Sequence, residues 1–145
     1  MQLLKKTVML ITGLWLFGMF ISCKSSNPVN PKVPVKTQLE GTWTGTNMNG
    51  TDQTLYTYKM AVDSIFVSAD SNEMYHGTFT LDTVALPAQI TILITKSDSA
   101  SYVGKTIPAI YVLSGNVLEI TANNPGSSRP TSFDSGEILK LFLQE

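Results

Sequence analysis

From Leu39 to the end of the chain, apolar and polar residues alternate in short runs, and turn-forming residues separate the runs. A period of two is typical of β-strands with one buried face, because successive side chains of a strand point to opposite faces. No window keeps the spacing of an amphipathic helix beyond about two turns. The pattern predicts eight strands, over residues 39–46, 54–62, 64–68, 73–81, 88–95, 106–113, 117–121 and 137–144.

Short turns connect most of these segments, which favours antiparallel pairing between neighbours in the sequence. Eight antiparallel strands close into a small barrel whose interior is filled by side chains or holds one small ligand. Closure also removes the unpaired edges that an open sheet must protect. We therefore predict an all-β domain over residues 39–145, folded as a small eight-stranded antiparallel barrel, with an open β-sandwich as the alternative.

One set of apolar and aromatic side chains is predicted to point into this barrel. Such a lining suits an apolar ligand that a few tyrosine hydroxyls orient. The other interpretation is a filled core without a cavity. The candidate ligand-binding residues are Tyr56, Tyr58, Met60, Tyr75, Phe79 and Tyr111, with Ile92 and Leu139 also facing inward.

The start of the chain has a different pattern. Lys5 and Lys6 precede an apolar run of 14 residues, Val8–Ile21. A membrane span needs about 20 apolar residues, so this run is short for a span and has the layout of an export signal. We predict a signal peptide over residues 1–22.

The only cysteine of the chain follows this run directly, in Phe20-Ile21-Ser22-Cys23. The segment resembles the bacterial lipobox, in which a signal peptidase cuts before a lipid-modified cysteine, although Phe20 stands where leucine is usual. The resemblance implies a lipoprotein whose partner is the membrane, through acyl chains on Cys23. Several acyl chains anchor a protein far more firmly than one. An ordinary signal anchor with an incidental cysteine is the alternative.

Residues 23–38 form the predicted linker, which comprises Cys23 and a segment with three prolines and little to bury. Proline favours extended backbone, so this segment is expected to act as a semi-rigid spacer. No acidic run follows Cys23, and Lys24 at the second position resembles lipoproteins that are passed on to the outer membrane. In a bacterium with two membranes, we expect the domain at the outer membrane, facing the periplasm.

Charge and composition exclude several functions. The net charge of −1 gives no electrostatic basis for binding nucleic acid. One histidine and one cysteine cannot form a structural zinc site. The sequence has no G-x-S-x-G nucleophile motif, no EF-hand spacing and no glycine-rich phosphate loop. His76 is interpreted as a surface strand residue. We therefore expect a protein that is not an enzyme and has no metal or other cofactor.

Several motifs of the domain share their order and spacing with a known family. Together they resemble a small lipocalin-like domain family of bacterial envelope proteins, over nearly all of residues 41–145. The family has no established activity. This chain departs from its pattern in lacking acidic residues around the turn at residues 114–116 and a cysteine after Ile120. The matching segments are Gly41-Thr42-Trp43, Gly77–Asp82, Gly104-Lys105-Thr106, Ile110–Leu118 and Arg129–Phe133.

The G-x-W segment at Trp43 also resembles that of lipocalins, where the tryptophan packs at the closed end of the barrel under an arginine from late in the sequence. By this resemblance, Arg129 is expected to cover Trp43 and to form a structural plug with it. A cation–π contact of this kind contributes about 0.5–2 kcal/mol. A solvated Arg129 in its polar loop is the alternative.

We expect a cell-envelope lipoprotein whose lipocalin-like barrel binds a small apolar molecule or lipid. A cavity above about 300 Å³ would favour this function. The alternative is a filled barrel that docks a protein partner through its loops, such as residues 96–105 and 123–135. A solid core beside an exposed apolar patch would favour that function.

Overall fold

The computed structural model describes residues 38–51, 53–134 and 136–145. The predicted signal peptide, Cys23 and the linker up to residue 37 lie outside these ranges. Within them, no helical segment has the length and hydrophobicity that a membrane span requires.

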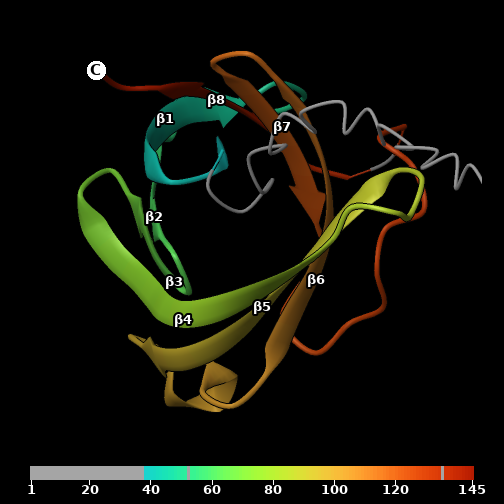
Figure 1. Ribbon diagram of the computed structural model, residues 1–145. Coiled ribbons are helices and arrows are strands. Elements are labelled where there is room, and N and C mark those ends of the chain that lie inside the picture. The colour runs from blue at the N-terminus through green and yellow to red at the C-terminus, as the bar shows by residue number, and fades with distance from the viewer. Residues whose placement is uncertain (1–37, 52, 135) are drawn as a thin grey trace, which may run out of the picture. The chain divides into compact units, whose positions relative to one another are not determined.

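The described residues form one closed antiparallel barrel. Each strand pairs with its neighbours in the sequence, and the last strand pairs with the first (Figure 1). The predicted all-β fold with eight antiparallel strands is therefore confirmed, and an open sandwich is excluded. The elements are β1 (Gly41–Asn47), β2 (Tyr56–Ala61), β3 (Ser64–Ala69), β4 (Asn72–Asp82), β5 (Ala88–Ser97), the 3-10 helix η1 (Ala100–Tyr102), β6 (Thr106–Ser114), β7 (Val117–Ala122) and β8 (Ile138–Leu143).

The alternation seen in the sequence sorts side chains between the two faces of the barrel wall. In β2, Tyr58 and Met60 are buried, whereas Lys59 between them is exposed. In β5, the three isoleucines Ile90, Ile92 and Ile94 all point into the core. The side chains predicted to face inward are buried, except for Tyr56, which is half-buried against the core.

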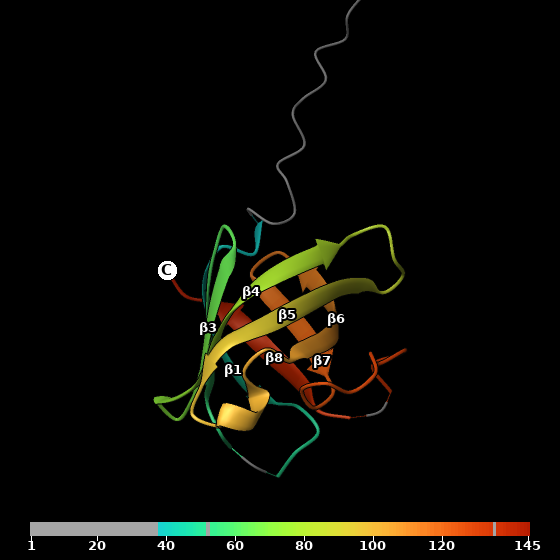
Figure 2. The same ribbon diagram turned by 90° about the horizontal axis from the view of Figure 1, so that it is seen from below.

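The two ends of the barrel differ. We name as the closed end the one where β1 begins and β8 ends, and as the open end the opposite one. Trp43 is fully buried near the closed end, and its indole Nε1 donates a hydrogen bond to the backbone oxygen of Leu39 at 2.9 Å. Leu39 is itself buried, so the turn before β1 closes this end. Figure 2 shows η1 at the open end.

Closure of the barrel between β1 and β8 depends on a glycine. At Gly45, which pairs with Leu141, an added Cβ would lie 1.8 Å from the backbone oxygen of Lys140. Real Cβ atoms do not approach backbone so closely, so a side chain at this position would force the two strands apart. The glycine allows the close approach that joins the last strand to the first.

Arg129 does not cover Trp43, which differs from the expectation drawn from the resemblance. Its Nη1 donates to the backbone oxygens of Ile90, at 2.8 Å, and Ala109, and its Nη2 donates to Thr91 Oγ1 at 2.6 Å. Because the neighbours of Thr91 point inward, Thr91 faces outward, and the guanidinium lies on the outer face of β5 and β6. No hydrogen bond or cation–π pair joins it to Trp43 in the described ranges. Arg129 therefore attaches the loop between β7 and β8 to the barrel wall.

Candidate functional site

The barrel contains a cavity of about 230 Å³ near its open end. The closed end is filled by large apolar side chains, among them Trp43, Ile65, Ile90 and Leu141, each with 2% of its surface exposed or less. The interior is thus divided between a packed half and a hollow half. The closed end matches the interpretation as a filled core, and the open end contains the cavity that the interpretation as a ligand lining requires.

Strand residues form the apolar wall of the cavity. They come from β2, β3, β4, β6, β7 and β8, so the wall surrounds the barrel axis rather than lying on one sheet face. The apolar members are Val67, Met74, Ile107, Ile120, Ala122 and Leu139. A wall of this kind excludes water from a bound apolar group.

Four tyrosines also line the cavity: Tyr56, Tyr58, Tyr75 and Tyr102. Tyr58 and Tyr75 are buried, and their hydroxyls form a hydrogen bond with each other. Burial raises the pKa of Tyr58 to about 12, with smaller contributions from the hydroxyl of Tyr56 and the carboxylate of Glu137. Burial also raises the pKa of Tyr75 well above its usual value. Both side chains are therefore neutral hydrogen-bonding groups at physiological pH.

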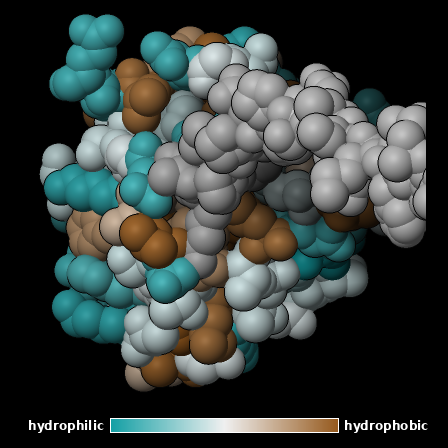
Figure 3. All heavy atoms as spheres, viewed as in Figure 1, coloured by the Kyte–Doolittle hydropathy of each residue, from teal (hydrophilic) through white to brown (hydrophobic). Residues whose placement is uncertain are grey.

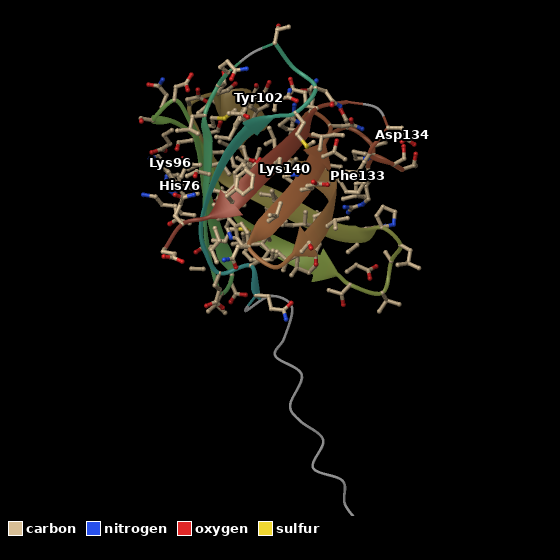
Figure 4. All side chains as sticks on the ribbon, turned by 90° about the horizontal axis from the view of Figure 1, so that it is seen from above. His76, Lys96, Tyr102, Phe133, Asp134 and Lys140 are labelled. Carbon is tan, nitrogen blue, oxygen red and sulfur yellow. The ribbon has the colours of Figure 1, made fainter. Side chains whose placement is uncertain are left out.

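Loops complete the mouth of the cavity. Tyr102 stands on η1, at the upper end of the barrel in Figure 4. Asp98 precedes η1, and its Oδ1 accepts hydrogen bonds from the backbone N–H of Ser99, at 2.7 Å, and from Ser97 Oγ, at 3.1 Å. Across the mouth, the loop after β7 contributes residues 123–125, and Glu137 lies just before β8. The mouth is therefore polar above an apolar wall.

The predicted ligand-binding residues divide between the two halves of the barrel. Tyr56, Tyr58 and Tyr75 lie together on the cavity wall. Three others are buried but lie outside the lining of the cavity: Met60, Phe79 and Tyr111. Ligand binding by any of the six stays a prediction.

The sequence does not predict the polar and loop residues as part of the cavity. Asp98 and Tyr102 stand in the loop 96–105, which the sequence offers as a docking loop for a protein partner, and Glu137 falls in the predicted last strand. Strand alternation does not apply to loops, so the period of two carried no signal for these positions. Their position relative to the cavity follows only from closure of the barrel.

The single histidine lies on the outer face of the barrel, away from the cavity. His76 Nε2 is 3.2 Å from Glu73 Oε1, and Lys96 Nζ is 2.8 Å from the same oxygen (His76 and Lys96 are labelled in Figure 4). Hydrogen bonds from Lys96 and then His76 lower the pKa of Glu73. These side chains are partly exposed, so the cluster is a surface ion pair between Lys96 and Glu73 with His76 beside it. No group of metal-ligating side chains occurs in the described ranges.

No family model matches the chain, and the searches of curated proteins and of solved structures also found no match. The geometry of the barrel and its cavity is therefore the basis of the functional argument.

Proposed function

We propose that this protein is a non-enzymatic, lipocalin-like lipoprotein of the cell envelope that holds a small, largely apolar molecule in its barrel. The cavity at the open end is the observation that carries this proposal. The cavity combines an apolar wall with two neutral hydroxyls, those of Tyr58 and Tyr75, which are hydrogen-bonded to each other. A few polar groups in an otherwise apolar cavity are typical of sites that orient a small ligand.

The size of the cavity limits the ligand. Pockets for drug-sized molecules usually enclose about 300–1,000 Å³. This cavity has about 230 Å³, which is below the volume that we expected to favour binding. An apolar cavity of about 150 Å³ in another protein holds benzene. The volume therefore favours a single ring with a short substituent over a lipid chain.

The anchor belongs to the same proposal. The basic start, the short apolar run and the small residue before Cys23 support export and lipidation. Lipid on Cys23 would keep the barrel at a membrane, at the outer membrane facing the periplasm in a bacterium with two membranes.

Native mass spectrometry of the full-length protein, extracted gently from its own membranes, tests the binding function. We expect a one-to-one small-molecule adduct that is lost on denaturation. Ala122→Phe places a ring in the cavity and should abolish the adduct, since Ala122 lines it. Ala61→Phe introduces the same ring at an exposed position and should retain the adduct. An adduct-free wild-type mass under several extraction conditions would contradict the proposal.

A second candidate function, docking of a protein partner, is favoured by one feature. The loop between β4 and β5 presents Val84 and Leu86, with 89% and 96% of their surface exposed. This loop lies toward the closed end of the barrel, away from the cavity (Figure 2). Figure 3 shows further hydrophobic residues among hydrophilic ones on the face seen in Figure 1. Loss of a co-purifying protein in the Val84→Ser/Leu86→Ser variant would support this function.

A further inference from the structure

The ionisable side chains that line the cavity are either negatively charged or neutral at physiological pH. Asp98 and Glu137 are its two carboxylates, and the lining, which consists of described residues, contains no lysine, arginine or histidine. The two carboxylates come from different loops, before η1 and before β8. Repulsion by the carboxylate of Glu137 is the smallest of the causes that raise the pKa of Tyr58.

The rings around the cavity add a second, independent attraction for positive charge. The faces of aromatic rings attract cations, and ammonium ligands are bound in this way by cages of aromatic side chains. Four tyrosines line this cavity. Lys105 Nζ already lies 5.9 Å from the centroid of the Tyr102 ring, so the rings that remain for a ligand are those of Tyr56, Tyr58 and Tyr75.

We propose that the cavity selects a small organic cation, an ammonium group attached to a single ring or a short apolar chain. The apolar part would lie against the strand wall, and the ammonium group would lie at the mouth between Asp98, Glu137 and the tyrosines. This inference rests on the proposed function, since it names the class of ligand for the same cavity.

The same arrangement disfavours anions such as fatty acids. A carboxylate ligand in this cavity would face Asp98 and Glu137 with no cationic side chain in the lining to pair with. Like charges at short range repel. Asp98 and Glu137 are exposed, so water and salt screen part of this repulsion. Lys105 Nζ lies 5.9 Å from the centroid of the Tyr102 ring but is not part of the cavity lining.

The test compares three probes of similar size that differ in charge: phenethylammonium, 2-phenylethanol and phenylacetate. Calorimetric titrations use the full-length protein in lipid nanodiscs, with empty nanodiscs as the blank. We expect phenethylammonium to bind at least about tenfold more tightly than 2-phenylethanol, and phenylacetate to bind most weakly. Added salt should reduce the difference.

Variants test which side chains cause the preference for the cation. The Asp98→Asn/Glu137→Gln double variant should lose most of the preference for phenethylammonium over 2-phenylethanol, and the part that the tyrosine rings contribute should remain. Thermal unfolding of the variant checks separately that it is folded. Glu145→Gln removes a carboxylate after the end of β8, at the closed end, and should leave the preference intact.

The outcomes separate the two proposals. Equal or tighter binding of 2-phenylethanol or phenylacetate would overturn the cation preference and leave ligand binding in place. Binding of none of the three probes, together with an adduct-free native mass, would overturn both proposals. A preference of unchanged size in the double variant would overturn the roles of Asp98 and Glu137.

Discussion

Tyr58 and Tyr75 combine two properties that a binding cavity needs. Each lines the cavity with an aromatic ring and has a hydroxyl that is already hydrogen-bonded to the other. Pairing of the two hydroxyls offsets the cost of burying them, because an unpaired buried hydroxyl costs about 1–3 kcal/mol. The polar groups of the site are thus held in place without a ligand.

The buried tyrosines should make the protein sensitive to alkali. An unfolded tyrosine loses its proton near pH 10, whereas Tyr58 in the folded barrel keeps its proton up to about pH 12. Below pH 10 the contribution of Tyr58 to the free energy of unfolding is fully present, because the residue is neutral in both states. As the pH rises to 12, the free energy of unfolding should fall by roughly 2–3 kcal/mol, because only the unfolded chain loses the proton readily. Denaturant titrations across this range measure the effect.

Tyr58→Phe removes one of the two buried ionisable hydroxyls and should reduce this alkaline loss of stability by the contribution of Tyr58, while Tyr75, whose pKa burial also raises, keeps its own contribution. Tyr102→Phe, at an exposed position on η1, is the matched control and should leave the loss as it is. An alkaline loss as steep in Tyr58→Phe as in the wild type would contradict the assignment.

Gly45 provides a second prediction at the residue scale. Gly45→Ala should lower the free energy of unfolding by more than about 3 kcal/mol, because the new methyl group meets the backbone of β8. Thermal unfolding measures the effect. Gly50→Ala, whose new Cβ would contact only the side chain of Asn47, should change stability by less than about 1 kcal/mol. Similar stability of both variants would show that β1 and β8 tolerate a wider separation.

Among the elements, the long connection between β7 and β8 is the one that Arg129 organises. The guanidinium holds the loop against the outer face of β5 and β6, with three acceptors on those strands. The same loop supplies residues 123–125 and Glu137 to the mouth of the cavity. By holding this loop against the barrel wall, Arg129 helps to position the residues at the mouth of the cavity.

Arg129→Lys should lower the free energy of unfolding by about 1.5–3 kcal/mol, because an ammonium group cannot reproduce the planar fork of the guanidinium. Calorimetric melting measures the loss, and faster amide exchange confined to residues 123–134 would locate it. The emission of Trp43 should stay unchanged. Unchanged stability and unchanged amide exchange in Arg129→Lys would contradict this role of Arg129.

The strands were predictable and the mouth was not, for one physical reason. In β2 and β5 the period of two is imposed by burial of one face, so Tyr58 and Ile92 could be assigned to the interior from the sequence. Asp98 and Tyr102 have no such pattern, because their position depends on where the connection between β5 and β6 folds. The same holds for Arg129: two of its three acceptors are backbone carbonyls, which any sequence could provide.

For the whole molecule, the proposal joins an anchor to a binding domain. The anchor depends on Cys23, outside the described residues. Cys23→Ser should abolish incorporation of labelled fatty acid and move the protein from the membrane fraction to the soluble fraction. Ser22→Ala keeps a small residue before the cysteine and should retain both. Continued labelling of Cys23→Ser would contradict lipidation at this residue.

The central claim is that the hollow half of the barrel is a ligand site. Its most direct test is a crystal structure of the protein purified from its own membranes without added ligand. We predict continuous non-protein density in the cavity, in contact with the hydroxyls of Tyr58 and Tyr75 and extending toward Glu137. Separate water peaks alone, or a cavity closed by inward movement of the loops, would contradict the claim.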